Sequence, residues 1–413
     1  MIPRHQLAVA PRITLPSLLE ASASLCSSST APLDIFAANL QREFSAPRCV
    51  LTDSGTSALV LALRLLVGKN GTVALPGYGC VDITSAVRCA GIRARLYDVD
   101  PRTLSPDLDS VLGALTQGVD AILVAHYYGY PADITGIRAL AAAWNVPVLE
   151  DAAQAAGGTL DGARLGSLGD VSVLSFGRGK GLFGGRGGAL LVRSAELVER
   201  MPTALPLGRR RGFGDVAAAM AQWALGRPTL YAVPASLPWL HLGEMVYRPA
   251  HEPRGLSHAA ATLANWSLAN EQNDRRLRSR RAEVLDRIAA EAESVHAIRS
   301  IDGGTSGYLR FAVLDTSGSR NAAARLGVMR AYPRTLREQP ELRSLLLPSQ
   351  PAIAGADELT RSLFTLPTHF KVRQSDFVGL RRWLAGRPTP SATAYAGENL
   401  LNLEVAVPKS SSV

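Results

Sequence analysis

The 413-residue sequence predicts an α/β fold, in which a large domain holds a mostly parallel sheet and a smaller α+β domain follows it. Two observations carry this prediction. Short apolar runs of strand length, rich in β-branched residues, alternate with segments of helical length through the first half of the chain. Parallel strands need long crossovers that usually contain a helix, so this alternation is typical of right-handed βαβ units. The chain is also long enough to bury a large core in two domains.

The individual elements follow from the same apolar patterns. In the first half, the sequence predicts strands at residues 49–51, 73–75, 95–99, 121–126, 146–149, 171–176 and 189–192. Helices are predicted between them at 34–45, 58–66, 82–90 and 107–115. In the second half, one long helix or two shorter ones are predicted over 257–292, a strand over 308–314, and helices over 321–328 and 374–385.

Changes in composition indicate where the domains begin and end. Residues 1–31 end in a Ser-rich stretch and are predicted to form an arm over the large domain, which covers 32–247. The smaller domain covers 248–386. Residues 387–413 are rich in Pro, Ser, Ala and Asn, which is typical of a flexible tail.

An atypical apolar and basic insert occupies residues 202–247. Three arginines (Arg209, Arg210 and Arg211) precede Trp223, Trp239 and several apolar turns. Prolines break the apolar runs, and none reaches the about 18 residues that cross a bilayer. The segment could lie on a membrane surface, but packing on its own fold or on a partner subunit is the favoured interpretation.

The composition is that of a globular protein with a basic surface. The net charge is +9, and 40 of the 44 basic residues are arginines. These arginines are either ordinary solvated side chains or a means to attract an anionic substrate such as a nucleotide diphosphate sugar. No nucleic-acid-binding module is recognisable, so no nucleic-acid partner is predicted.

The cysteines and histidines indicate neither disulfides nor metal. The cysteines, which show no CxxC pairing, are Cys26, Cys49, Cys80 and Cys89. The seven histidines have no metal-ligand spacing, so no metal site is predicted. Unpaired thiols fit a reducing cytosol. The N-terminus contains prolines and arginines and does not resemble a signal peptide, so a cytoplasmic location is predicted.

Candidate chemistry gathers around three of the predicted strands. Asp151 and Ser175 lie at strand ends, where open α/β sheets place their sites. The glycine loop at 177–181 contains Lys180. The chain has only four lysines, and Lys180 alone has a strand end before it and glycines on both sides. An amine can lose its proton and attack a carbonyl, whereas a guanidinium cannot. This favours Schiff-base chemistry, and a surface lysine in a flexible loop is the alternative.

These residues supply what pyridoxal phosphate needs, which is a lysine, a carboxylate for the ring nitrogen and donors for the phosphate. Asp151 provides the carboxylate, and Gln154 lies close enough in sequence to reach the ring hydroxyl. Ser175 can donate to phosphate. The segment 54–57 precedes an apolar helix, whose N-terminus suits a phosphate. An ordinary Ser/Thr cap is the alternative for that segment.

Five motifs resemble the DegT/DnrJ/StrS group of sugar aminotransferases, and they occur in the order SGTSAL, EDAAQ, GSLGD, SFGRGK and GGRGGA. The resemblance covers roughly residues 32–384. It implies the aspartate-aminotransferase-like fold type I, with a seven-stranded, mostly parallel sheet, and pyridoxal phosphate as cofactor. It also implies that Lys180 is the Schiff-base lysine and Asp151 the partner of the ring nitrogen. The remaining cofactor contacts would be Gln154 on the ring hydroxyl and Gly55, Thr56, Ser57 and Ser175 on the phosphate.

The sequence departs from the group's pattern at two positions near the cofactor. Cys80 stands where an aromatic residue usually stacks on the ring, which leaves Tyr78 or a neighbour to cover that face, with core packing as the alternative for Tyr78. Arg186 replaces an acid, and it either binds an anionic substrate group or faces solvent.

Further matches concern the substrate and the subunits. Tyr332 and His369 match segments at the group's substrate edge, whereas His126 is expected to be structural. The asparagine that reaches a neighbouring subunit's phosphate is missing from 251–257. A homodimer with its sites at the interface is therefore expected without that contact.

The resemblance implies an aminotransferase that moves an amino group from an amino acid, expected to be L-glutamate, to a nucleotide-linked keto-sugar. The product would serve the synthesis of a polysaccharide or a glycosylated metabolite. Two alternatives remain. One is a relative that aminates a non-sugar ketone of the aminocyclitol or aminoshikimate type. The other is a catalytically silent regulatory or scaffold protein.

Overall fold

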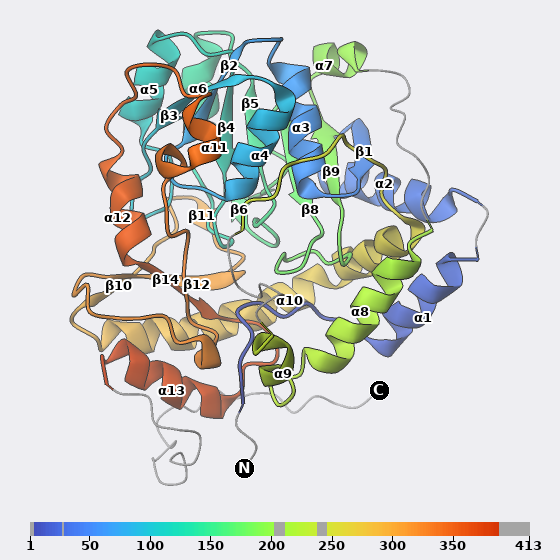
Figure 1. Cartoon of the computed structure of the whole chain (residues 1–413), viewed down its shortest axis with the longest axis vertical. Coiled ribbons are helices and arrows are strands. Elements are labelled where there is room, and N and C mark those ends of the chain that lie inside the picture. Colours follow the sequence, from blue (N-terminus) through green and yellow to red (C-terminus); the bar gives the residue numbers. More distant parts are fainter. Residues whose placement is uncertain (1–3, 27–28, 202–210, 238–245, 388–413) are drawn as a thin grey trace.

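A computed structural model describes residues 4–26, 29–201, 211–237 and 246–387 (Figure 1). Its centre is a seven-stranded sheet, as the sequence predicted. The strands, in spatial order, are β1 (Arg48–Thr52), β9 (Gly188–Val192), β8 (Val171–Ser175), β5 (Val148–Asp151), β4 (Ala121–Ala125), β2 (Thr72–Pro76) and β3 (Arg93–Tyr97).

The sheet is mostly parallel because helical crossovers connect its strands. β9 alone runs against its neighbours β1 and β8, since it follows β8 directly through the glycine loop. Every residue of β2, β4 and β9 is buried, as expected for strands that are covered on both faces. The carboxyl ends of the parallel strands therefore meet at one edge of the sheet.

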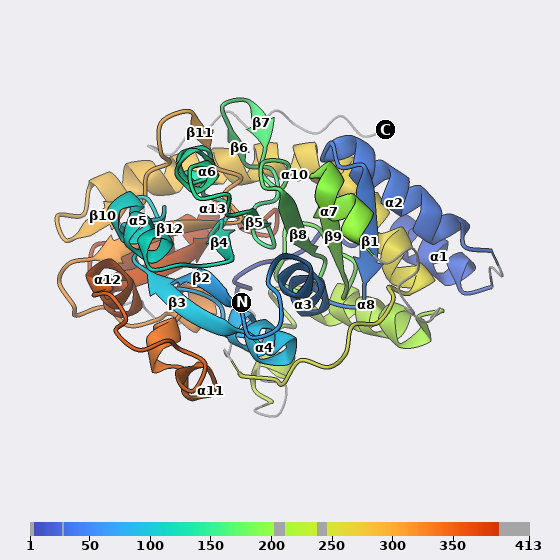
Figure 2. The same cartoon turned by 90° about the horizontal axis from the view of Figure 1, so that it is seen from above.

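Helices cover both faces of this sheet, and Figure 2 shows α3 and α4 on one side and α2 and α6 on the other. The helices of this part are α2 (Ala31–Glu43), α3 (Gly55–Leu66), α4 (Val81–Ala90), α5 (Leu108–Thr116), α6 (Ile134–Ala142) and α7 (Ala195–Arg200). A small three-stranded sheet lies nearby, formed by β11 (Gly304–Thr305), β6 (Thr159–Leu160) and β7 (Ala163–Arg164).

A second, antiparallel sheet forms the core of the C-terminal part. Its order is β10 (Val295–Ala297), β12 (Arg310–Asp315), β14 (Leu363–Pro367) and β13 (Met329–Arg330). Helix α10 (His258–Ala290) is a single helix, which decides between the two predicted possibilities. Its first half buries alanines in the core of the large sheet, and its second half packs in a separate core with Phe311, Leu366 and Trp383. The division into domains at residues 247 and 248 stays a prediction.

Shorter elements complete this part of the chain. They are η3 (Leu336–Glu338), α11 (Pro340–Arg343), α12 (Ala354–Ser362) and α13 (Gln374–Leu384). The predicted helix at 321–328 is wrong. That segment contains only the 3-10 turn η2 (Ala324–Leu326), after which Gly327 adopts a φ of 73° and Val328 pairs with Ala323. The chain must reverse here to enter β13, and a continuous helix would carry it in the wrong direction.

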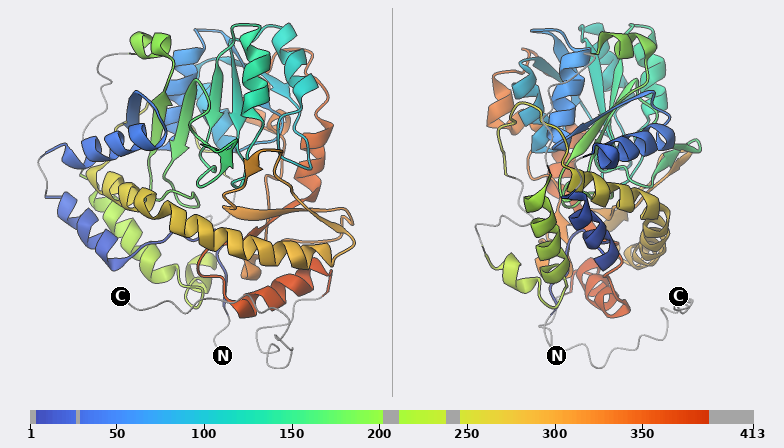
Figure 3. Two further views of the ribbon diagram at one scale, coloured as in Figure 1. Left: turned by 180° about the vertical axis from the view of Figure 1, so that it is seen from behind. Right: turned by 90° about the vertical axis from the view of Figure 1, so that its right-hand side faces the viewer.

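The described part of the insert packs on its own fold. Helix α8 (Phe213–Leu225) lies beside α1 (Leu15–Ser24) and α10, as the left panel of Figure 3 shows, and the short helix α9 (Ala232–Ala235) follows it. The contact buries Leu18, Phe183 and Leu263. Among the described residues, no helix is both long enough and apolar enough to cross a membrane.

Several predictions fall outside the described residues. They concern Arg209 and Arg210, Trp239 and the tail from residue 388 onward. The N-terminal arm is described from residue 4, and it reaches beyond the large sheet. The backbone N–H of Gln6 donates to the carbonyl of Arg325 at 2.8 Å, and Arg4 lies 3.3 Å from Asp376. The first residues of the arm therefore contact the C-terminal part.

Candidate active site

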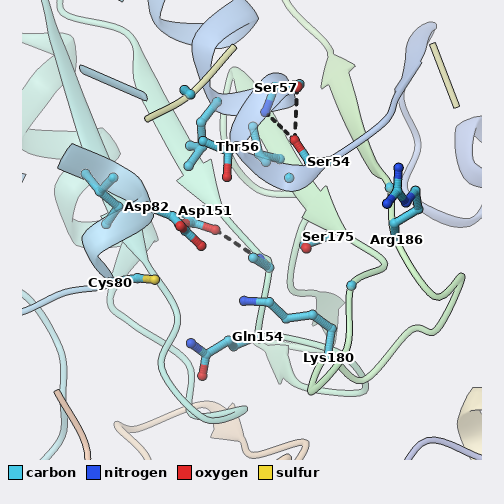
Figure 4. Close-up of a pocket in the computed structure, with 18 of the residues that line it drawn as sticks. Ser54, Thr56, Ser57, Cys80, Asp82, Asp151, Gln154, Ser175, Lys180 and Arg186 are labelled. Atoms are coloured by element: carbon cyan, nitrogen blue, oxygen red, sulfur yellow. Dashed lines mark hydrogen bonds between the residues drawn. The ribbon is translucent and has the colours of Figure 1, made fainter. Parts of the chain in front are cut away.

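A cavity of about 500 Å³ opens where the carboxyl ends of β5 and β8 meet the start of α3. Figure 4 shows the side chains that face it. The predicted residues that line the cavity are Gly55, Thr56, Ser57, Cys80, Asp151, Gln154, Ser175, Lys180, Arg186 and Tyr332. Residues predicted from distant parts of the chain thus converge on one space.

Asp151 is the last residue of β5 and is buried at the inner end of the cavity. Its carboxylate accepts one described hydrogen bond, from the backbone N–H of Ala153 at 3.0 Å. Burial raises the pKa of Asp151, and the Ala153 amide and the charge of Lys180 offset this only in part. An acid with so few donors is available to a cationic or N–H-bearing ligand.

Lys180 lies in the glycine loop between β8 and β9, and its side chain extends toward Asp151 and Gln154 (Figure 4). The loop is closed by a bridge between Gly177 and Gly185. Gly187, at the end of the loop, has a φ of 109°, and a Cβ there would lie 2.3 Å from a methyl carbon of Leu256. Only glycine fits this position, so the loop that carries Lys180 is shaped by its sequence.

The start of α3 presents a group of donors to the cavity. Ser54 caps the helix, and its Oγ accepts the N–H of Ser57 at 3.0 Å. A Cβ at Gly55 would lie 2.8 Å from the Cβ of Ser175, so the glycine allows the helix start to touch the end of β8. Thr56 points into the same space (Figure 4). Free N–H groups and hydroxyls at a helix N-terminus form a site that favours an anion.

Gln154 is held from two sides. Its Oε1 accepts the N–H of Tyr128 at 3.2 Å, and its Nε2 donates to the hydroxyl of Tyr332 at 2.5 Å. The amide is thereby fixed beside Lys180 at the cavity wall. Tyr332 lies on the segment after β13, so this contact joins the C-terminal part to the large sheet.

Two predicted substrate residues lie outside the cavity. Tyr78 is fully buried, and its hydroxyl accepts the N–H of Tyr332 at 3.2 Å, so it has the core position that was its alternative. Cys80 faces the cavity instead, and burial raises the pKa of its thiol, so the group stays neutral. His369 is also buried, and its Nε2 lies 2.8 Å from the carbonyl of Leu7. The N-terminal arm covers that end of β14 and removes His369 from the site.

Arg186 lies at the edge of the cavity with its side chain about half exposed. Its Nε is 2.9 Å from Asp215 on α8, which also accepts the hydroxyl of Ser257 at 2.6 Å. The guanidinium therefore links the glycine loop to the insert. Its remaining N–H groups can still meet a ligand at the mouth of the cavity.

Among the cavity-lining residues that the sequence analysis missed are five with acidic or basic side chains, namely Asp53, Asp82, Arg178, Arg248 and His251. Asp53 directly precedes the SGTSAL motif, and Asp82 follows Cys80 by two residues, so proximity to these motifs could have indicated both. Arg178 belongs to the glycine loop that the analysis did single out. The path of the chain after the insert brings Arg248 and His251 to the cavity. His251 begins the segment 251–257 that the resemblance had placed near a cofactor phosphate, whereas Arg248 carries no signal in the sequence.

Behind the cavity, Glu150 is fully buried on the opposite face of β5. Its oxygens accept the N–H groups of Gly166, Leu168 and Gly169 and the hydroxyl of Ser172. His126 lies 3.0 Å away through Nε2, and its Nδ1 accepts the N–H of Ala132, which fits the predicted structural role. Burial raises the pKa of Glu150, but the His126 hydrogen bond and the backbone donors lower it to about 2.

Comparisons with known proteins find named aminotransferases among the similar chains. The chain is 34% identical over 255 residues to the L-glutamine:2-deoxy-scyllo-inosose aminotransferase of Streptoalloteichus tenebrarius, a match that covers 60% of this chain and 55% of that protein. It is 36% identical over 152 residues to the dTDP-4-dehydro-2,3,6-trideoxy-D-glucose 4-aminotransferase of Saccharopolyspora spinosa, which covers 37% and 40%. The chain thus spans about half the length of the curated relatives it matches.

The fold is shared over a longer range. The crystal structure of the aminotransferase TlmJ from Streptoalloteichus hindustanus superposes with a TM-score of 0.72 at 26% identity, and it covers 92% of this chain and 98% of that one. A family model matches residues 23–229, about half of the chain. This range includes all strands of the large sheet, the start of α3 and the glycine loop. The chain belongs to the DegT/DnrJ/EryC1/StrS aminotransferase family.

Proposed function

We propose that this chain transfers an amino group from an amino acid to a cyclic ketone of the sugar or cyclitol class, with pyridoxal phosphate as its cofactor. One observation carries the proposal. Three groups converge on one cavity. They are the amine of Lys180, the carboxylate of Asp151, which accepts a single described hydrogen bond, and the hydroxyl-rich start of α3. These three groups are what the cofactor requires of a protein.

The residues present fit the cofactor. Lys180 would hold its aldehyde, and Asp151 would face its ring nitrogen. The phosphate would lie at the start of α3, on Thr56, Ser57 and Ser175, where Gly55 leaves room that a Cβ would fill. Gln154 would contact the ring hydroxyl. The neutral thiol of Cys80 would face the ring where relatives carry an aromatic side chain.

The side chains divide the work between proton transfer and charge. Bound pyridoxal phosphate supplies an electron sink for the α-carbon of the donor. Once the amine of the donor has displaced it from the cofactor, Lys180 Nζ would take the proton from that carbon as a base and deliver it to C4′ of the cofactor as an acid. Asp151 stabilises positive charge at the ring nitrogen. Gln154, fixed by Tyr128 and Tyr332, orients the ligand beside Lys180.

The acceptor class follows from charge and from the relatives. Three arginines lie at the cavity edge, and a basic edge favours an anionic acceptor such as a nucleotide-linked keto-sugar. The relative from Saccharopolyspora spinosa has a name of this kind. The relative from Streptoalloteichus tenebrarius is named for an inosose without a nucleotide, which supports an aminocyclitol-type acceptor as the second candidate. Its name also gives L-glutamine as donor, beside the L-glutamate that we expect. A cytoplasmic homodimer in polysaccharide or glycosylated-metabolite synthesis completes the proposal.

The first experiment is an absorbance spectrum of the purified protein with added pyridoxal phosphate, before and after L-glutamate or L-glutamine. We expect a visible band that either donor shifts, and no such band in Lys180→Ala. Lys69→Ala is the matched control, because Lys69 is an exposed lysine in a surface turn. Absence of a band in the wild-type protein would overturn the proposal. Turnover with nucleotide-linked keto-sugars against 2-deoxy-scyllo-inosose then decides the acceptor.

A further inference from the structure

The site for an anion at the start of α3 contains an acid. Asp53 lies between β1 and the helix, lines the cavity and is only 7% exposed. Its carboxylate accepts the hydroxyl proton of Ser57 at 2.7 Å. A phosphate bound at this helix start would meet a buried negative charge nearby, which opposes binding unless that charge is offset.

The described contacts of the Asp53 carboxylate contain a single group that can be cationic. One contact is the hydroxyl of Ser57, and another is the backbone N–H of Arg254 at 3.4 Å. The third is Nε2 of His251, which lies 3.4 Å from Oδ2. His251 also lines the cavity, and its side chain is 52% exposed.

Both ring nitrogens of His251 face acceptor atoms. Nδ1 lies 2.8 Å from the carbonyl oxygen of Glu252, which can only accept. Nε2 faces a carboxylate, which also can only accept. With Nε2 unprotonated, two lone pairs would oppose one another. A ring that carries a proton on each nitrogen can donate to both acceptors.

Other polar and charged groups around His251 and Asp53 have partners of their own or line other parts of the cavity. Glu252 pairs with Arg64 at 2.8 Å, and the Cys89 thiol donates to the carbonyl of His251. Arg254 approaches Asp53 through its backbone. The remaining charged groups of the cavity wall are Asp82, Asp151, Arg178, Lys180, Arg186 and Arg248.

We infer that His251 is the counter-charge of Asp53 and thereby positions the phosphate end of the ligand at the start of α3. The inference rests on the proposed function, because it takes that phosphate to belong to pyridoxal phosphate. His251 does not contact the reacting atoms. It cancels the charge of Asp53, while Asp53 holds Ser57 at the helix start.

The test compares binding of pyridoxal phosphate and of pyridoxal, which lacks the phosphate, by wild-type protein, His251→Gln, Asp53→Asn and the double variant. We expect His251→Gln to weaken pyridoxal phosphate about tenfold, roughly the effect of one partly exposed charge, and to leave pyridoxal unchanged. The double variant should regain much of the lost affinity, since the neutral amide introduced by Asp53→Asn needs no counter-charge. His296→Gln, at an exposed histidine of β10, is the matched control.

Equal losses for both ligands, or no rescue in the double variant, would overturn the inference. Sulfate separates it from the proposed function, because sulfate stays a dianion between about pH 5 and about pH 8, where imidazoles change charge. Sulfate should raise the melting temperature of the wild-type protein more at the lower pH, and this difference should vanish in His251→Gln. If the wild-type protein shows the sulfate effect but binds no pyridoxal phosphate, the cofactor assignment is wrong and the role of His251 as counter-charge of Asp53 is supported. A sulfate effect that is the same in His251→Gln would contradict the role of His251 and leave the cofactor assignment unaffected.

Discussion

Glu150 and Asp151 are consecutive buried acids on β5 that face opposite sides of the sheet, and they differ in the hydrogen bonds that their carboxylates accept. Glu150 accepts four hydrogen bonds from the 166–172 segment and a fifth from His126. Asp151 accepts one described hydrogen bond, from Ala153. The pKa of Glu150 is accordingly lowered to about 2, whereas burial raises that of Asp151.

The difference is the one expected between an acid that supports the fold and an acid that binds a ligand. Side chains alternate between the faces of a strand, so neighbours in sequence enter different environments. A buried carboxylate that accepts a hydrogen bond at every available position stabilises the segments that donate to it. Substituting such a carboxylate leaves those buried donors without an acceptor. A buried carboxylate with few donors costs stability, and such a cost is typical of sites that await a ligand.

The largest expected effect is on stability, from Glu150→Ala. Removing this carboxylate leaves the N–H groups of three residues and the side chains of His126 and Ser172 without their acceptor. We expect the free energy of unfolding to fall by about 3–5 kcal/mol, measured by urea denaturation. A loss below about 1 kcal/mol would show that Glu150 is not a structural centre.

The second effect is on activity, from Asp151→Asn. The amide cannot stabilise positive charge at a ring nitrogen, so turnover should fall by about 10²–10³-fold. The free energy of unfolding should stay equal or rise, because a poorly supplied buried charge has been removed. Steady-state kinetics and urea denaturation of the same preparation test both expectations. A variant with normal turnover would contradict the assignment of Asp151.

Stability should respond to pH in opposite directions at the two acids. The folded-state pKa of Glu150, about 2, lies below its ordinary value of 4.5, so its stabilisation of up to about 3 kcal/mol is present above pH 4.5 and is lost as the pH falls toward 2. The folded-state pKa of Asp151 is raised, so its contribution is present at low pH and is lost as the pH rises. Unfolding measured at several acid pH values should therefore show a shallower acid loss in Glu150→Gln and a steeper one in Asp151→Asn. Parallel curves would contradict the contrast.

The smallest effects come from a matched pair of serines on β8. Ser172 donates to Glu150, and Ser175 faces the cavity. Ser172→Ala should lower the free energy of unfolding by about 1–2 kcal/mol and leave the affinity for pyridoxal phosphate unchanged. Ser175→Ala should weaken that affinity about fivefold, equivalent to about 1 kcal/mol, with little change in unfolding. The reverse pattern would place the two serines on the wrong faces.

Local features of the chain were enough to predict much of this molecule. The apolar runs predicted all seven strands of the large sheet, because each strand is a short run with apolar residues between turns. The helix predicted at 321–328 failed because its apolar pattern is compatible with a helix, while the reversal at Gly327 depends on pairing with distant β14 through β13.

The positions of Lys180 and Asp151 could be predicted from the residues alone, because a strand end and a glycine loop place a side chain through local geometry. Which residues around them face the cavity depended on the packing of the whole chain. The turn after β2 places Cys80 in the cavity and Tyr78 in the core. The carbonyl of Leu7, 362 residues away in the chain, contacts the ring of His369 and keeps it outside the cavity. His251 likewise contacts Asp53, a residue distant from it in the sequence. Contacts of this kind leave no period or motif, because they depend on how complete elements pack against one another.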